Sequence, residues 1–260
     1  MLRAFSTAAT GMDAQQTMVD VIANNLANVN TNGFKRVNVN FQDLLYVKMR
    51  QASREVASGV TAPSGLEVGS GVKTASTTRA FSVGDMQSTR NELDVAIQGD
   101  GFFQVTLPSG ELRYTRDGAF QKDANGVIVN ASGYPISPTI TIPQDAIAVD
   151  IAADGTVSVE TPAGTQVVGS IQTYRFPNNA GLSAEGGNLF RETEASGAAI
   201  AGTPGEQGFG GLLSQYLEKS NVQMVTELVN LITAQRAYEI NSRTIRTGDN
   251  MLQQLNQLVR

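Results

Sequence analysis

The chain has no cysteine, no histidine and no tryptophan among its 260 residues. The absence of cysteine excludes disulfides, thiolate metal sites and cysteine nucleophiles, and it suits an oxidising or extracytoplasmic compartment. Without histidine, the chain also lacks the most widely used general base, proton shuttle and metal ligand. Only carboxylates, lysines, tyrosines and hydroxyls remain for catalysis. We therefore expect a protein that needs no cofactor and is not an enzyme.

Strong positive charge and long apolar runs are also missing. The net charge is -5, with no basic patch to bind nucleic acid. The N-terminus has no charged segment followed by an apolar core, and no run approaches the roughly 18 apolar residues of a membrane span. We expect neither a Sec signal nor a membrane-spanning helix. If the protein leaves the cytoplasm, another route must export it.

Three motifs resemble functional sites only superficially. The segment 69–74 (GSGVKT) lacks the spacing of a phosphate-binding loop. The segment 123–126 (DANG) resembles the start of a calcium loop, but the later acidic ligand is absent, and a hairpin turn explains it better. Asp94, Asp100 and Asp117 lie near expected turns, and two of them could conceivably act as an acid pair. Aspartates are more common as turn formers, so these residues favour structure over catalysis.

The last forty or so residues predict a long helix. Ser220 and Gln223 match a capping box, which predicts a helix start near Ser220. About 38 residues at 1.5 Å each give a rod of roughly 55 Å, longer than one compact domain usually needs. Apolar residues recur at every seventh position, the spacing of a helix seam buried against another helix; they are Leu231, Tyr238, Ile245, Leu252 and Val259.

A second apolar stripe runs beside this seam in the first third of the helix: Val222, Val225, Val229 and Ile232. The combined apolar surface is too wide for one partner helix, so two or more neighbours are implied. Arg236, Glu239, Arg243 and Asp249 are expected to supply solvent-face and interchain ion pairs. The alternative is a terminal helix that docks on the core of its own domain.

Residues 2–29 predict a second seam helix. Its apolar residues also recur every seven positions: Phe5, Met12, Val19 and Leu26. Arg3, Asp13 and Asp20 are its only charges, fewer than an exposed helix normally carries. We predict that the two terminal helices pair with each other and with copies of themselves. An amphipathic helix buried inside one globule is the alternative.

An asparagine-rich corner follows the first helix, with five asparagines between residues 24 and 32. Asn32 followed by Gly33 is a strong turn or helix-stop signal. An ordinary helix exit does not require the other asparagines, and uncharged carboxamides form lateral hydrogen bonds well. We therefore assign four of them to a candidate subunit interface: Asn24, Asn25, Asn28 and Asn30.

The middle of the chain changes from helical to extended patterning. Residues 37–78 form a Ser-, Gly- and Ala-rich extended connector, and residues 79–205 alternate apolar and polar positions between turn signals such as Asn125-Gly126 and Asp154-Gly155. The sequence predicts an α+β fold, in which an inserted, mainly antiparallel β domain separates two paired terminal helices. The expected domains are 1–36 with 212–260, the connector 37–78, and a β-rich domain with its return loop over 79–211.

Four segments resemble the bacterial flagellar rod and hook protein family. They are residues 23–36 (ANNLANVNTNGFKR), 92–103 (ELDVAIQGDGFF), 114–120 (YTRDGAF) and 231–241 (LITAQRAYEIN). The likeness spans the whole chain. Within the family, the length and the connector Leu45–Gly71 favour a subunit of the distal rod. A subunit of the proximal rod is the nearest alternative, and hook subunits are normally longer.

The resemblance implies a structural subunit of a hollow helical drive shaft. Its partners would be copies of itself, neighbouring rod and hook proteins, and the periplasmic and outer-membrane rings. The flagellar type III apparatus would export it without a Sec signal to the basal-body rod, which crosses the periplasm. Its termini would stay disordered until assembly. The connector would stiffen the tube through Tyr46, Pro63 and Leu66.

Two other classes of protein remain open at this point. A secreted adhesin with a β-rich binding domain would be a stable monomer with ordered termini. A carboxylate-based hydrolase would lose a measurable activity when Asp94 or Asp117 is changed.

Overall fold

The computed structural model describes residues 2–50, 55–57, 60–61, 65–206 and 208–258. The chain divides into two compact units. The helical unit comprises Met1–Leu26, Val37–Thr78 and Met224–Arg260, and the β unit comprises residues 27–36 and Arg79–Gln223. The α+β class predicted from the sequence is confirmed.

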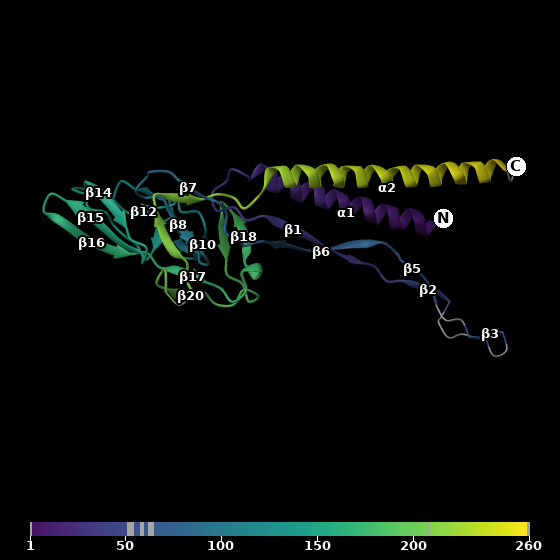
Figure 1. Cartoon of the computed structure of the whole chain (residues 1–260), viewed down its shortest axis with the longest axis horizontal. Helices are drawn as coiled ribbons and strands as arrows, with labels where there is room; N and C mark the ends of the chain where they lie inside the picture. Colours follow the sequence, from purple (N-terminus) through teal and green to yellow (C-terminus); the bar gives the residue numbers. More distant parts are fainter. Residues whose placement is uncertain (1, 51–54, 58–59, 62–64, 207, 259–260) are drawn as a thin grey trace. The chain divides into compact units, whose positions relative to one another are not determined.

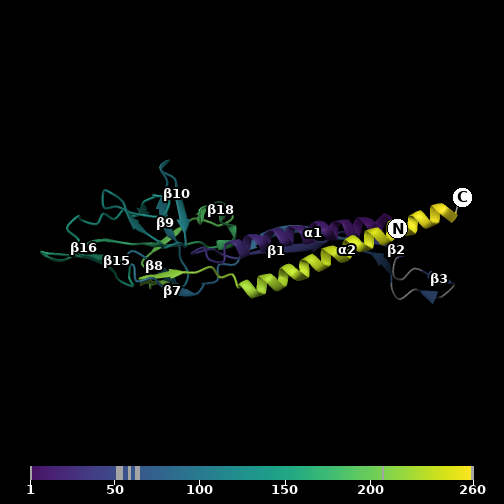
Figure 2. The same ribbon diagram turned by 90° about the horizontal axis from the view of Figure 1, so that it is seen from above.

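Two antiparallel helices form the core of the helical unit: α1 (Leu2–Ala27) and α2 (Met224–Leu258) (Figures 1 and 2). They pack together at two glycines: a Cβ added to Gly11 would lie 2.8 Å from Asn241 Nδ2, and one added to Gly248 would lie 2.7 Å from Phe5 Cζ. Neither helix, over its described residues, is long and apolar enough to cross a membrane.

The predicted start of α2 near Ser220 is wrong, because the helix begins at Met224. The Ser220 hydroxyl oxygen accepts a hydrogen bond of 3.3 Å from the Val222 N–H, which closes a local turn. Asn221 meanwhile donates its side-chain amide to the carbonyl oxygens of Ala80 and Ser82. These bonds hold residues 220–222 to the β unit in a non-helical conformation.

A two-stranded antiparallel ribbon occupies the expected connector, and its strands pair outward from its base (Figure 1). The pairs are β1 (Val37–Asp43) with β6 (Val72–Arg79), β2 (Val47–Arg50) with β5 (Leu66–Val68), and β3 (Glu55–Ala57) with β4 (Val60–Thr61). Most of its described side chains are exposed or half-buried. Near residues 69–74, the Thr10 hydroxyl accepts the N–H of Val72 at 3.4 Å.

The β unit is built from short antiparallel strands, as the alternating pattern predicted. Its largest sheet has five strands in the order β13 (Ile136–Ser137), β9 (Phe103–Thr106), β10 (Leu112–Thr115), β19 (Leu189–Arg191) and β18 (Ser183–Gly186). A three-stranded sheet has the order β14 (Ala148–Ile151), β15 (Thr156–Thr161) and β16 (Gly164–Ser170). Four strand pairs complete the unit: β7 (Met86–Ser88) with β22 (Tyr216–Glu218), β8 (Val95–Gln98) with β21 (Gly211–Ser214), β11 (Gln121–Lys122) with β12 (Ile128–Val129), and β17 (Thr173–Arg175) with β20 (Ile200–Gly202). A short 3-10 helix, η1, spans Asn179–Gly181.

The predicted turns connect these strands. Gly126 has a φ of 81° and Gly155 a φ of 88°, in the left-handed region that favours glycine. The N–H of Gly126 donates to the Asp123 carbonyl oxygen at 2.9 Å, so residues 123–126 form the hairpin turn between β11 and β12. The hairpin interpretation of this segment is therefore confirmed.

The β unit has its own core, in two clusters. The first contains Phe103 packed edge-to-face on Phe120, with ring centroids 5.1 Å apart. The second is aromatic: Tyr114 stacks edge-on against Phe176 with centroids 4.7 Å apart. Phe103 is 0% exposed. Burial of a large side chain of this kind contributes about 1.5–3 kcal/mol, so these two clusters stabilise the β unit.

Candidate assembly interface

The apolar residues of the predicted helix seam are only partly buried within the chain. All four α1 seam residues are half-buried: Phe5, Met12, Val19 and Leu26. On α2, Leu231, Ile245 and Leu252 are half-buried, Tyr238 is exposed, and Val259 lies outside the described residues. Grooves along the helices include one of about 380 Å³ beside Phe5 and Met251 and one of about 540 Å³ beside Val19 and Tyr238. The helices touch, but their apolar surface is not fully used within the chain.

Three of the four residues of the predicted second stripe are open to solvent: Val225 is 75% exposed, Val229 55% and Ile232 50%. The fourth, Val222, precedes α2 and is buried, so its assignment to this stripe is wrong. Arg236 continues the same face and is also exposed. A single exposed valine is ordinary, but three in a row on one helix face are typical of an interaction surface.

The asparagines of the corner have different environments. Asn25 is buried, and its amide donates to the Val37 carbonyl oxygen while its oxygen accepts the Val37 N–H, both at 2.9 Å. Asn28 is half-buried and its oxygen accepts the Thr31 hydroxyl at 3.1 Å. Asn24 and Asn30 are exposed. Thus Asn25 is engaged inside the chain, where it fixes the first residue of β1 at the end of α1.

The predicted stiffening residues lie on the ribbon. Tyr46 and Leu66 are both more than half exposed, and so is Met49 between them. Tyr46 lies close to Gly69 across the ribbon, because a Cβ at that glycine would meet the tyrosine ring at 3.5 Å. Pro63 lies outside the described residues.

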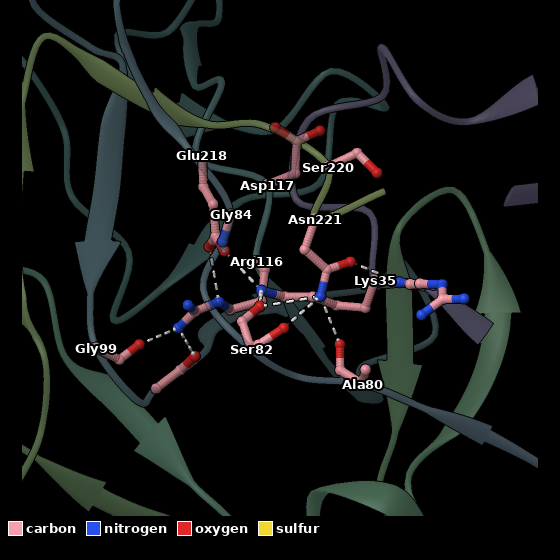
Figure 3. Close-up of polar contacts among 12 residues, drawn as sticks. Lys35, Ala80, Ser82, Gly84, Gly99, Arg116, Asp117, Glu218, Ser220 and Asn221 are labelled. Carbon is pink, nitrogen blue, oxygen red and sulfur yellow. Dashed lines mark hydrogen bonds and ion pairs between the residues drawn. The ribbon is translucent and has the colours of Figure 1, made fainter. Parts of the chain in front are cut away.

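A buried ion cluster lies in the β unit, which the sequence reasoning missed (Figure 3). The Glu218 carboxylate forms two ion pairs. Its Oε1 lies 2.6 Å from the Lys35 ammonium nitrogen, and its Oε2 lies 3.0 Å from Nε of the Arg116 guanidinium. All three side chains are at most 3% exposed. Arg116 also donates to the carbonyl oxygens of Gly99 and Gly101, at 2.8 and 2.7 Å.

The cluster joins chain segments that are far apart in sequence. Lys35 also donates to the Ser82 carbonyl oxygen at 2.7 Å, and the Gly84 N–H donates to Glu218 Oε1 at 2.8 Å. The Gly33 N–H donates to the Glu218 carbonyl oxygen at 2.8 Å. The residues that follow α1 and those that precede α2 are therefore fastened to the same β unit.

The electrostatics of the cluster are governed by burial. Burial lowers the pKa of the Lys35 ammonium, and the neighbouring Arg116 cation acts in the same direction. Glu218 opposes both effects, because its carboxylate favours the charged lysine. Two buried cations share this one carboxylate, so removing it would leave both uncompensated.

Two of the three aspartates considered for catalysis, Asp94 and Asp117, have structural partners for their side chains, and Asp100 is exposed. Asn91 Nδ2 donates to Asp94 at 3.0 Å, and the Ala119 N–H donates to Asp117 at 3.1 Å. Burial raises the pKa of the Asp117 carboxyl, and the nearby Asp94 adds to this effect. Within the described part of the chain, no three acidic side chains gather as a metal site would require. The arrangement serves turn formation.

Comparisons with known proteins agree with this architecture. Residues 5–35 match a family described as flagella basal body rod protein, residues 96–159 the flagellar hook protein FlgE/F/G D1 domain, and residues 213–258 the flagellar basal body rod FlgEFG protein C-terminal family. The chain is 52% identical over 251 residues to the flagellar basal-body rod protein FlgG of Buchnera aphidicola subsp. Schizaphis graminum, covering 96% of each chain. It is 48% identical to FlgG of Borreliella burgdorferi, covering 100% of each chain, and 50% identical to FlgG of Caulobacter vibrioides, covering 99% of each. The chain therefore belongs to the FlgG family of flagellar basal-body rod proteins, and it is a structural subunit of the rod.

Proposed function

We propose that this chain is a distal rod subunit that polymerises into a hollow helical drive shaft, which transmits torque from motor to hook and forms part of the export channel. The observation that carries the proposal is the open apolar stripe Val225–Ile232 on α2, next to a helix seam that is only half-closed. The full-length likeness to FlgG proteins favours the distal rod over a proximal rod or hook subunit.

The mechanism follows from where apolar surface is buried. The β unit has a complete core, whereas the helices leave apolar residues in water. Ordering one residue costs roughly 1–2 kcal/mol of backbone entropy, so helices with an incomplete core are marginal alone. Assembly covers their open faces and offsets this cost. Folding of the termini is thus coupled to polymerisation.

The proposal includes the surroundings of the subunit. The partners are copies of this chain, neighbouring rod and hook proteins, the rings around the rod and the type III export apparatus. The rod crosses the periplasm, and export occurs without a Sec signal. The chain acts as a structural element and not as an enzyme; the engagement of Asp94 and Asp117 in turn hydrogen bonds supports this role.

The ribbon gives the tube its stiffness in this proposal. Leu45, Tyr46 and Met49 are exposed on it and would pack against neighbouring subunits. Deleting residues 46–65 should shorten this contact and yield a rod that bends. An unchanged straight rod would refute the role of the ribbon without affecting the proposal for the helices.

Polymerisation of the purified chain tests the proposal as a whole. We expect concentrated protein to form sedimentable tubes visible by electron microscopy, and a chain without residues 224–260 to remain monomeric. A full chain that stays monomeric at high concentration, with protected termini, would contradict the proposed function.

A further inference from the structure

The three-stranded sheet of the β unit ends on one side in an open edge. Its outermost strand, β16, is hydrogen-bonded to β15 and, among the described residues, to no strand on its other side (Figure 1). Residues 164–167 of β16 are exposed, and the Val167 side chain is 63% exposed. No charged residue lies between Glu160 and Arg175. An edge of this kind is a ready template for pairing with another strand.

The other outer strands of the two larger sheets are each protected against such pairing. β13 lies between Pro135 and Pro138, and proline cannot donate to a strand ladder. β18 carries the charged Glu185. On β14, the N–H of Val149 is already occupied, because it donates to the Glu92 carboxylate at 2.9 Å. β16 contains neither proline nor charge, so its edge differs from the other three.

The bond that Val149 donates also fixes the direction of the backbone groups across this sheet. In an antiparallel sheet, a residue directs its N–H and C=O to one side, and the next residue directs them to the other. The N–H of Val149 points away from β15, so its partner Val159 directs its own groups toward Gln166 of β16. Thr165 and Val167 therefore direct their N–H and C=O groups to the open edge.

The open edge of β16 is complementary to a second copy of itself. When two copies lie antiparallel with Gln166 opposite Gln166, Thr165 of each copy faces Val167 of the other. Both of these pairs consist of residues with outward backbone groups, so each pair can exchange two hydrogen bonds. Threonine and valine are β-branched, and such residues pack well across neighbouring strands.

We propose that free subunits form a reversible two-fold dimer through β16, with Gln166 of one copy opposite Gln166 of the other. The partner is a second copy because the outward groups of this strand match each other in that register, and because β16 has no charge to oppose its approach. The proposal goes beyond the proposed function, since it concerns the β unit and does not involve the terminal helices.

The small size of the contact makes the dimer reversible. A β-bulge at Val168 interrupts the pairing with β15 and ends the regular edge, so only residues 164–167 are available. Such a contact buries far less than the roughly 1,200 Å² of a stable complex. A two-fold contact is also closed, whereas a helical polymer repeats a head-to-tail contact. The dimer is therefore separate from the proposed assembly.

A single introduced cysteine tests the register, because the natural chain has none. Gln166→Cys places two thiols opposite each other in a pair whose Cα atoms lie about 4.5 Å apart. This separation lies within the roughly 4.4–6.8 Å that a disulfide spans. Ser170→Cys, also exposed on β16, is the matched control. Its two copies would lie on opposite sides of the two-fold axis, about 26 Å apart along the strands.

The full-length variants would be cleared of sedimentable polymer, mildly oxidised and compared on a non-reducing gel. We expect at least about tenfold more disulfide-linked dimer from Gln166→Cys than from Ser170→Cys. Similar yields from the two variants, or no dimer from Gln166→Cys, would overturn the proposed dimer. If the natural chain still forms tubes, that result leaves the proposed function intact. A chain that cross-links through position 166 and never polymerises would contradict the proposed function and not the dimer.

A lysine on the open edge gives a second readout. Val167→Lys, added to Gln166→Cys, should lower the yield of cross-linked dimer about tenfold, because an edge lysine resists strand pairing. The fold should tolerate this change, since the Val167 side chain is already exposed. Ile200→Lys is the matched control, because Ile200 is 55% exposed on β20 and the charge change is the same. An unchanged yield with Val167→Lys, or an equal loss with both lysines, would show that the subunits do not pair through β16.

Discussion

The two units of this chain use their apolar residues differently. In the β unit, Phe103, Val105 and Ile136 are all 0% exposed. In the helical unit, Val225, Val229 and Ile232 are at least half exposed, although they belong to a helix of 35 residues. One region buries its apolar surface within the chain, whereas the other leaves apolar side chains exposed. This difference is the basis of the proposal that the β unit supplies the folded subunit and the helices supply the assembly surface.

The largest effect should come from Glu218→Gln, which removes the carboxylate that pairs with both Lys35 and Arg116. Breaking a buried ion pair from one side costs about 3–5 kcal/mol, because the remaining charges stay buried. Urea unfolding followed by circular dichroism should show this loss. Glu111→Gln is the control, since Glu111 is exposed and Arg113 keeps Glu185 as a partner. A loss below about 1 kcal/mol would show that the cluster does not hold the β unit together.

Glycine replacements compare the two units by the same chemical change. Gly33 has a φ of 66°, and a Cβ there would lie 2.7 Å from the backbone of Arg116 and Asp117. Gly33→Ala should therefore destabilise the β unit by more than about 1 kcal/mol. A Cβ at Gly11 meets only the end of the Asn241 side chain, which can move away. Gly11→Ala should change the midpoint of thermal unfolding little. If both alanine variants lose the same stability, the two units do not differ in how tightly they pack at these glycines.

The open stripe should matter only to assembly. Replacing Val229 and Ile232 by serine should change the unfolding free energy of the monomer by less than about 0.5 kcal/mol, because both side chains are already exposed. The same protein should fail to form sedimentable polymer. Thr233→Ser, also exposed on α2, is the matched control. A destabilised monomer would mean that the stripe packs within its own chain.

The smallest effect concerns pH. Burial raises the pKa of Asp117 above that of the unfolded chain, so its contribution to stability is present below the unfolded pKa and is lost as pH rises through the folded pKa. Asp117→Asn should reduce this fall in the unfolding free energy when it is measured against pH in the acid range. Asp154→Asn should change the pH dependence in the opposite direction, because the hydrogen bond from the Thr156 N–H lowers the pKa of Asp154. If the natural chain and the two variants show the same dependence of unfolding free energy on pH, this assignment is contradicted.

Local patterns predicted much of this fold. Heptad spacing identified both helices, and Asn125-Gly126 and Asp154-Gly155 marked real turns because glycine alone adopts positive φ easily. The ion cluster could not be predicted from the sequence, because Lys35 and Glu218 are separated by 183 residues and no periodic pattern connects them. The start of α2 was misplaced for a related reason. Hydrogen bonds from Asn221 to the distant residues Ala80 and Ser82 override the local capping signal at Ser220.

The interface residues named from the sequence differ in how exposed the structure leaves them. The stripe Val225, Val229 and Ile232 is exposed and remains the best candidate surface. Asn25 looked equivalent to its neighbours in the sequence, yet it is buried and bonded to Val37. Composition cannot separate an asparagine that caps its own chain from one that faces a partner, because both use the same carboxamide.

Amide hydrogen exchange on the monomer and on the polymer tests the central claim most directly. We predict that residues 2–27 and 224–258 exchange fast in a verified monomer, while residues 79–223 are protected. In the polymer, both helices should become protected. Strong protection of both helices in the monomer would contradict the account, because the helices would then satisfy each other without assembly.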